Sequence, residues 1–271
     1  MKRKLFKRKR KPLFLRKSFW FFILGLVFGG VIFFVILGSP WFQIKGIEFQ
    51  GNENLATEIL EDFIRKNIVQ NFLFFKSQSI FLVNSKIVSL LKSNFPEIEE
   101  VYFKKNFPDK IIFFLKERKG AIILCPEETK KESENPEERK DCFLADPAGF
   151  IFAKTKEDSE NNLLKIRTKE NLQVGREFQF DRRKLTEFLS LADFFEKQLK
   201  ISLSEISLVS PEKIIVFIKE GWLVFLSPEK NFQTQLNNLA AVLEEKIPSF
   251  QRERLEYIDL RFGEKVFYKF K

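Results

Sequence analysis

The hydrophobic pattern is dominated by one uncharged run of 27 residues, from 18 to 44. Its apolar part, residues 19–37, would be about 28 Å long as a helix, which is enough to cross the hydrocarbon core of a bilayer. Trp20 and Trp41 lie at its two ends, where interfacial aromatic residues are expected. We therefore predict a transmembrane helix over residues 19–40. A cleaved signal peptide is the alternative, but its apolar region would be too long and small residues are missing from both required positions.

The pattern after this run predicts five elements in the order β-α-α-β-β within about 75 residues. Strands are indicated by alternation of apolar and polar positions, and helices by apolar residues three and four positions apart. Residues 71–83 are rich in Phe and fit neither pattern. The strands are expected over residues 44–50, 98–105 and 110–116, with a turn at 106–109, and the helices over residues 55–68 and between the cap Asn84 and Pro96.

The remainder of the chain predicts mainly strands with two helices. The first helix covers residues 182–199, and Ser227-Pro228-Glu229 has the features of a helix start for the second: a capping residue, a Pro at the first position and an acid in the first turn. The strands are expected over residues 121–125, 142–145, 150–153, 201–209, 213–219, 222–226, 256–262 and 265–270.

A charged segment interrupts this second part. Residues 126–141 contain seven acids, four bases and no large apolar residue, which predicts a solvated loop. The fold class is therefore α+β: a transmembrane helix, a βααββ domain over residues 41–118, and a mainly antiparallel β domain with two flanking helices over residues 119–271.

The net charge of the chain comes from its first residues. The first 17 residues contain ten Lys or Arg residues and no acid, whereas the other 254 residues contain 37 of each charge. By the positive-inside bias, the tail of residues 1–18 is predicted to lie in the cytoplasm and the domains outside it. Attraction of this tail to anionic lipid is a simpler explanation than nucleic-acid binding, so we expect no nucleic-acid partner.

The residues needed for catalysis are scarce. The chain has no His, which removes the usual general base, the Ser-His-Asp and Cys-His sets and the commonest metal ligand. It has no P-loop and no Gly-x-Gly-x-x-Gly motif. Adjacent acids such as Glu99-Glu100 and Glu244-Glu245 indicate solvated surface. We therefore expect no enzyme activity, no cofactor and no metal.

Two cysteines, Cys125 and Cys142, end candidate strands on either side of the charged loop. An exported location permits a disulfide between them, because disulfides persist in that compartment. We expect these residues either to form a bond or to lie as cross-strand neighbours.

The last strand is the best candidate for a binding surface. A short, aromatic strand at this place in a sheet often lies at its edge, where unpaired N–H and C=O groups can accept an incoming strand. Lys265 and Lys269 also fit the opposite interpretation, a protected edge. Alternation puts Val266, Tyr268 and Phe270 on one face, which we expect to be buried, and Phe267 on the other. Asp259 and Arg261 share a face, so Arg261 is either an ion-pair partner or a contact residue.

Several motifs, taken in order, carry a resemblance to a known family. Residues 41–52 resemble its entry strand ending in Gly-Asn, and residues 107–118 resemble its Phe-Pro-Asp signature followed by Glu-Arg. Residues 145–152 resemble its Asp-x-x-Gly segment, and Tyr257-Ile258-Asp259-Leu260-Arg261 resembles its most specific motif. With one membrane anchor in front, this order resembles the bacterial cell-division family FtsQ/DivIB. Lys119-Gly120 and Leu226-Ser227 depart from the family pattern at two turns.

The resemblance implies a fold and a function. Residues 41–118 would be a POTRA domain, and residues 119–271 the family's β domain. The protein would be a non-enzymatic scaffold in the plasma membrane at the division septum, where it would bind FtsB/DivIC-like and FtsL-like proteins. The POTRA domain would contact other division proteins. The resemblance implies that the partner binds at Arg261, Phe262, Glu264, Lys265, Val266, Phe267, Tyr268, Lys269 and Phe270.

An alternative function belongs to another class. POTRA domains also occur in chaperones and assembly components of protein transport, and a membrane-anchored protein of that type remains open from the sequence. Such proteins normally carry repeated POTRA units or a membrane barrel, and only one βααββ unit is visible here.

Overall fold

The computed structural model describes residues 17–68, 70–72, 75–127, 141–157, 163–178, 182–210 and 213–271. Residues 1–16 of the predicted basic tail and residues 128–140 of the predicted charged loop lie outside the described residues. The chain divides into two compact units, one comprising Met1–Asn94 and Ile98–Glu117 and the other Phe95–Glu97 and Arg118–Lys271. Each is described by itself.

The first unit begins with the predicted apolar helix, α1 (Lys17–Gly38). By length and composition α1 is able to cross a membrane, and nearly all of its side chains are exposed. Its end is hydrogen-bonded to the rest of the unit. The hydroxyls of Ser77 and Ser79 donate to the carbonyls of Leu37 (2.7 Å) and Ile36 (3.0 Å). These bonds satisfy carbonyl groups that a helix end otherwise leaves without a partner.

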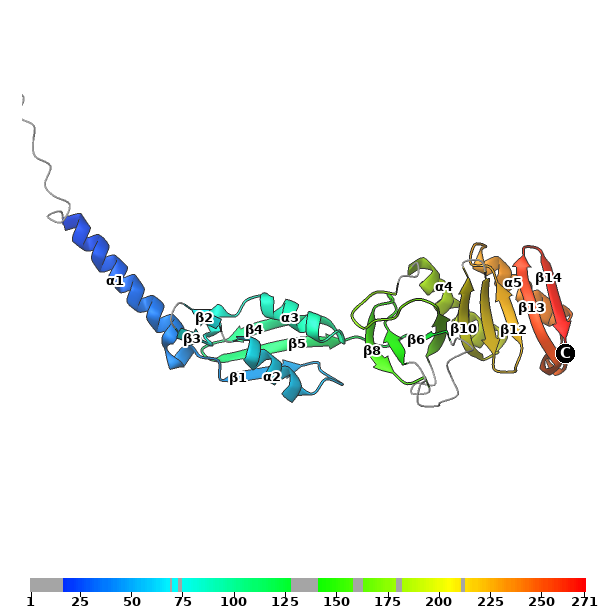
Figure 1. The fold of residues 1–271 in the computed structure, drawn as a ribbon, viewed down its shortest axis with the longest axis horizontal. Coiled ribbons are helices and arrows are strands. Elements are labelled where there is room, and N and C mark those ends of the chain that lie inside the picture. The colour runs from blue at the N-terminus through cyan, green and yellow to red at the C-terminus, as the bar shows by residue number, and fades with distance from the viewer. Residues whose placement is uncertain are drawn as a thin grey trace, which may run out of the picture. The chain divides into compact units, whose positions relative to one another are not determined.

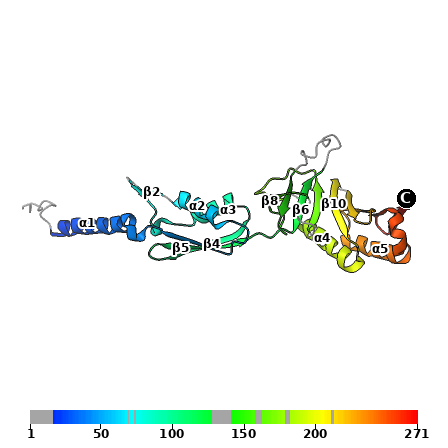
Figure 2. The same cartoon turned by 90° about the horizontal axis from the view of Figure 1, so that it is seen from below.

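The rest of the first unit is the predicted βααββ arrangement, with one addition. Its sheet has the order β1-β5-β4, in which β1 is parallel and β4 antiparallel to β5. Both helices lie on the same face of this sheet (Figures 1 and 2). A small β2–β3 hairpin and the short helix η3 occupy the stretch that fits neither pattern. The elements are η2 (Pro40–Phe42), β1 (Gly46–Gln50), α2 (Thr57–Ile68), β2 (Gln70–Phe72), β3 (Phe75–Ser77), η3 (Ile80–Leu82), α3 (Lys86–Asn94), β4 (Ile98–Asn106) and β5 (Lys110–Glu117).

The core of the first unit follows the periodicities of the sequence. Alternate residues of the central strand β5, Ile111 and Phe113, are fully buried, and they face the sheet side that the helices cover. Leu60 and Ile64 of α2 and Leu91 of α3 are also fully buried. Burial of one stripe on each helix against one face of the sheet is the main contribution to the stability of the unit.

The second unit contains a nine-stranded sheet in the described residues, with the order β14-β13-β12-β11-β10-β9-β6-β7-β8. Its ladders are antiparallel except for β6–β9, β9–β10 and β12–β13, which are parallel. The strands are β6 (Ile122–Pro126), β7 (Cys142–Ala145), β8 (Ile151–Thr155), β9 (Leu164–Thr168), β10 (Leu203–Ser210), β11 (Lys213–Ile218), β12 (Leu223–Leu226), β13 (Leu255–Phe262) and β14 (Lys265–Phe270).

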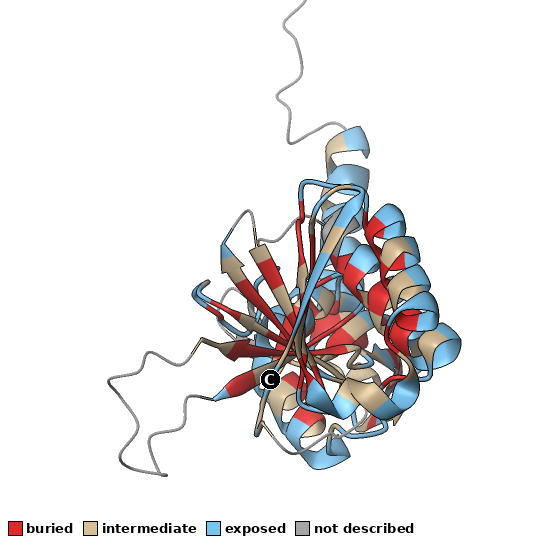
Figure 3. Cartoon of the chain, turned by 90° about the vertical axis from the view of Figure 1, so that its right-hand side faces the viewer, coloured by how far each residue is buried: buried red, intermediate tan, exposed pale blue. Residues whose placement is uncertain are grey.

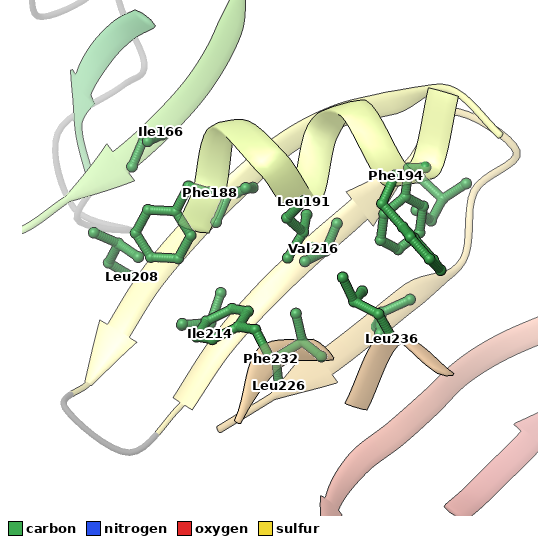
Figure 4. Packing of buried hydrophobic residues seen from close by; sticks show 14 of the residues in the cluster. Ile166, Phe188, Leu191, Phe194, Leu208, Ile214, Val216, Leu226, Phe232 and Leu236 are labelled. Atoms are coloured by element: carbon green, nitrogen blue, oxygen red, sulfur yellow. The ribbon is translucent and has the colours of Figure 1, made fainter. Parts of the chain in front are cut away.

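Two helices, α4 (Arg182–Asp193) and α5 (Phe232–Glu245), cover one face of this sheet (Figure 2). Figure 4 shows Phe188 and Leu191 of α4, and Phe232 of α5, packed over strand residues such as Ile214 and Val216. In Figure 3 the buried positions lie on the strands and on the helix sides that face them. A single apolar cluster therefore holds both helices on the sheet.

Two predicted helices of the second unit differ in the structure, and two of its short elements were not predicted. The second helix starts at Phe232, not at Ser227, because Asn231 is the cap and its Oδ1 accepts the N–H of Thr234 at 3.0 Å. The predicted helix over 182–199 changes after Asp193 into a π-helix, η5 (Phe194–Leu199). The strand β9 is absent from the sequence prediction. A short helix, η6 (Ser249–Arg254), also precedes β13. The α+β class and the main β domain are confirmed.

Candidate partner-binding edge

The strand β14 is the outermost strand of the large sheet and pairs only with β13 within the described part of the chain. The register places Asp259 opposite Phe267 and Ile258 opposite Tyr268. The turn between the strands contains Gly263, whose φ of +77° is in the left-handed region that favours glycine. The predicted edge position is therefore confirmed, and the outer side of β14 is available for pairing.

Two aromatic rings mark this edge. The rings of Phe262 and Phe267 meet edge to face with their centroids 5.2 Å apart. Both side chains are nonetheless about half exposed, at 56% and 51%. Single exposed apolar residues are common, but a contacting pair at a strand edge forms an apolar surface that a partner could cover.

The alternation along β14 is only partly as predicted. Val266 and Phe270 pack against the main core, as expected. Tyr268 belongs to the same alternation but remains 43% exposed, because β14 is the outermost strand of the sheet and no strand of the described residues pairs with its far side. Lys265, Phe267 and Lys269 are exposed, as predicted. The face of β14 that packs against the core is thus still exposed at Tyr268, between Val266 and Phe270.

Arg261 makes an ion pair with a residue of its own strand. Its Nε and Nη2 donate to the carboxylate of Asp259 at 2.9 and 2.6 Å. The hydrogen bond to Asp259 raises the pKa of Arg261, partial burial opposes the rise, and the nearby charge adds to it. The same carboxylate also accepts the N–H of Arg261 at 3.1 Å. The ion-pair interpretation is therefore observed, with the guanidinium held in one orientation.

The backbone of Arg261 is held from another direction. Its carbonyl oxygen accepts a hydrogen bond from Nζ of Lys230 at 2.6 Å. Its guanidinium also lies 5.5 Å from the ring centre of Phe225. Phe225 stacks on Tyr257 with ring centroids 5.2 Å apart. Sequence reasoning missed Phe225, Tyr257 and Lys230; strand alternation would have placed Tyr257 on the face of Arg261.

The remaining charged residues of the edge are on its surface. Lys269 pairs with Glu256 of β13 at 2.6 Å, and the hydrogen bond to Glu256 followed by its charge raises the pKa of Lys269. Glu264 lies in the turn and Lys265 begins β14, and both side chains are exposed. The candidate residues named from the sequence thus form one hairpin, of which only Val266 and Phe270 are committed to the core.

The two cysteines lie on β6 and β7, near the end of the sheet opposite to β14. The structure places Cys125 and Cys142 in a disulfide bond, with their Cα atoms 4.4 Å apart and both residues about 99% buried. They pack with Ile123, and Leu144 is half-buried against them. Among the residues that the structure describes, no group of three potential ligands could hold a metal ion.

The comparisons agree with this architecture. Residues 138–261 match the family model "Cell division protein FtsQ/DivIB, C-terminal", so the match ends within β13. Two proteins named cell division protein DivIB, both from Clostridium botulinum strains, are 29% and 28% identical to the chain over 195 residues. That is 72% of this chain and 62% of each relative, so the chain spans about three fifths of their length. Residues 138–261 of the chain are thus similar to the C-terminal domain of FtsQ/DivIB cell-division proteins.

Proposed function

We propose that the protein is a non-enzymatic division scaffold that holds a partner by strand addition at β14. The observation that carries this proposal is the position of β14: it is the outermost strand of the sheet and it exposes Phe262 and Phe267 beside its free side. A strand that pairs with β14 gains main-chain hydrogen bonds, and the two rings supply apolar contact. The similarity of residues 138–261 to the FtsQ/DivIB C-terminal model supports a role in cell division.

The partner that fits is an FtsB/DivIC-like protein together with its FtsL-like companion. Arg261 would position the start of the incoming segment, because Asp259 and Lys230 fix both its side chain and its carbonyl. Lys265 favours a partner segment with an acidic residue opposite it, since like charges across paired strands are destabilising. In binding, the protein would recruit and regulate septal cell-wall synthesis.

The proposed location is the plasma membrane. Helix α1 would cross it once, with the ten basic residues of the tail on the cytoplasmic side and residues 41–271 outside. The βααββ unit, as a POTRA domain over residues 41–118, would contact further division proteins. Protease added to intact spheroplasts should then remove residues 41–271 and spare the tail. Survival of residues 41–271 under added protease would contradict this topology.

The direct test of partner binding is the substitution Phe267→Pro. Proline lacks the N–H group and its ring disturbs the ladder, so it should abolish co-purification with the FtsB/DivIC-like protein of the same cells. The substitution touches only a terminal strand, so the melting temperature of the purified protein should fall little. A well-folded Phe267→Pro protein that binds as wild type does would place recognition elsewhere.

A matched control separates the edge from a general loss of exposed aromatic residues. Phe250 of η6 is 77% exposed and lies outside β13 and β14. Phe250→Ala should leave co-purification unchanged, whereas Phe262→Ala should weaken it. Equal effects of Phe250→Ala and Phe262→Ala would contradict a localised edge.

A further inference from the structure

An aromatic cluster lies where the membrane helix ends. It consists of Phe42 of η2, Phe81 of η3 and Phe107 of the β4–β5 turn, and Trp41 precedes Phe42 in η2. The rings of Phe42 and Phe81 are 5.3 Å apart between centroids, as are those of Phe81 and Phe107. Trp41, Phe81 and Phe107 are 76%, 43% and 54% exposed. Three segments that are distant in the sequence thus present one exposed aromatic surface.

The folded unit fixes this surface to the helix end. The carbonyl of Leu37 accepts hydrogen bonds from Ser77 Oγ (2.7 Å) and Gln43 Nε2 (3.1 Å). Ser77 is buried, and Gln43 in turn accepts the N–H of Gln78 at 2.9 Å through its side-chain oxygen. The helix η3, which carries Phe81, follows these residues directly in the chain. The position of the end of α1 in a bilayer therefore also sets the depth of Phe81.

The turn that carries Phe107 is hydrogen-bonded to the residues that follow η2. The carbonyl of Asp109 accepts the N–H groups of Lys45 (2.9 Å) and Gly46 (3.3 Å). The carboxylate of Asp109 pairs with Nζ of Lys45 at 3.1 Å. The carboxylate of Asp109, two residues after Phe107, is thereby paired with a neighbouring cation.

The length of α1 sets the depth of these rings. Its 22 residues span about 33 Å, slightly more than the roughly 30 Å hydrocarbon core of a bilayer. The polar interfacial layer adds about 5–7 Å on each side. Trp41 follows the helix end Gly38 by three residues, so the cluster falls within that layer. Trp and Tyr rings concentrate in this layer because it accommodates an apolar body beside polar groups.

We infer that Trp41, Phe42, Phe81 and Phe107 form a lipid-binding platform that seats the βααββ unit on the bilayer surface. The occupant is the lipid interface itself, because the platform is continuous with the membrane helix and Asp109, the acid that follows Phe107, is paired with Lys45. The unit would then be held to the membrane by α1 and by the platform together. This inference needs α1 to span the bilayer but does not depend on the partner proposed for β14.

The test reads the depth of a reporter at the platform in the full chain. Phe107→Trp is combined with Trp20→Phe and Trp41→Phe, and the protein alone is reconstituted in phosphatidylcholine vesicles. Trp222 is fully buried and gives a constant background. Tryptophan emission should be blue-shifted, and lipids brominated near the headgroup should quench it more than lipids brominated deep in the chains. Phe81→Trp in the same background should give the same result.

Tyr102→Trp is the control, because Tyr102 is an exposed aromatic residue of the same strand pair, five residues away from Phe107. It should emit as a water-exposed residue and escape quenching. Quenching at Phe107→Trp and Phe81→Trp no greater than at Tyr102→Trp would overturn the inference. Quenching that appears only when another division protein is added would also overturn it, because a protein would then be the occupant.

Discussion

Arg118 and Asp146 form an ion pair in which the guanidinium Nη1 lies 2.5 Å from the carboxylate Oδ2, with both side chains largely buried. The other carboxylate oxygen accepts the N–H groups of Ala148 and Phe150, both at 2.9 Å. Arg118 also donates to the carbonyl of Pro96 at 3.1 Å and lies 4.1 Å from the ring centre of Phe150. Two motifs recognised separately in the sequence thus belong to one contact network.

This network predicts the effect of neutralising Asp146. Asp146→Asn keeps the shape but leaves the guanidinium of Arg118 without its charge partner. Only about a fifth and a tenth of the two side chains are exposed, so the free energy of unfolding should fall by about 3 kcal/mol. Urea unfolding of the purified protein measures the change.

Asp141→Asn is the matched control for that experiment. Asp141 pairs with Lys154 at 2.7 Å in the same unit, but both side chains are mostly exposed. Solvent screens such a pair, so the loss should stay below about 1 kcal/mol. Equal losses for the two variants would show that the Arg118 pair has no special role.

Glu117 predicts a pH dependence of the first unit. Partial burial raises its pKa, but the N–H groups of Leu55, Asn54 and Glu53 and the Asn54 side chain outweigh this and lower the pKa below the ordinary value of 4.5. A group whose pKa is lower in the folded state stabilises the fold at pH values above its pKa in the unfolded state. This contribution is lost as the pH falls through its pKa in the folded state. The urea midpoint should therefore fall as the pH drops below about 4.5.

The same titration with Glu117→Gln separates this group from other acids. The amide cannot titrate, so the variant should start less stable at neutral pH and lose less stability on acidification. Parallel curves for the two proteins would assign the pH dependence to other groups.

Gly51 predicts a backbone effect. Its φ is +86°, and a Cβ atom there would lie 2.2 Å from the carbonyl oxygen of Leu115, which belongs to β5. Gly51→Ala should cost at least about 3 kcal/mol, from left-handed strain and from the clash. Gly175 has a φ of +85° and nothing within 4 Å of such a Cβ, so Gly175→Ala should cost only about 1 kcal/mol. Similar costs would mean that the backbone at Gly51 relaxes.

The disulfide predicts a difference between oxidised and reduced protein. The two cysteines are 17 residues apart, so opening the bond should cost about 3 kcal/mol by the chain-entropy estimate. Protein purified from the exported location should resist alkylation until reductant is added, as intact mass will show. Two thiols that are alkylated without reductant would refute the bond.

Local patterns predicted those elements whose stabilising contacts are local. The apolar stripes of α2 and α3 and the strands β4 and β5 follow from periodicity. The start of α5 did not, because Gln235, one turn inside the helix, exchanges hydrogen bonds with both backbone groups of Ser227 (2.8 and 3.0 Å) and holds the preceding residues in a turn. That contact depends on the burial of a polar side chain, which periodicity does not reveal.

Long-range pairing limited the rest of the prediction. Strand β9 lies between β6 and β10 with parallel ladders on both sides, so its partners are far away in the sequence. Parallel strands are not joined by a hairpin turn, so no turn motif in the sequence indicates β9. At the candidate edge, the sequence indicated the hairpin and the alternation of β14. It did not indicate that Tyr268 stays open or that Lys230 reaches Arg261, because both depend on which elements end the sheet.

The antiparallel ladder between β13 and β14 also has a mechanical consequence. Its hydrogen bonds run perpendicular to the strands. Tension that enters along a strand laid on β14 would therefore act on all of these bonds at once, whereas a pull at one end would open them one after another. The same edge could thus hold under a load along its length and release when it is peeled.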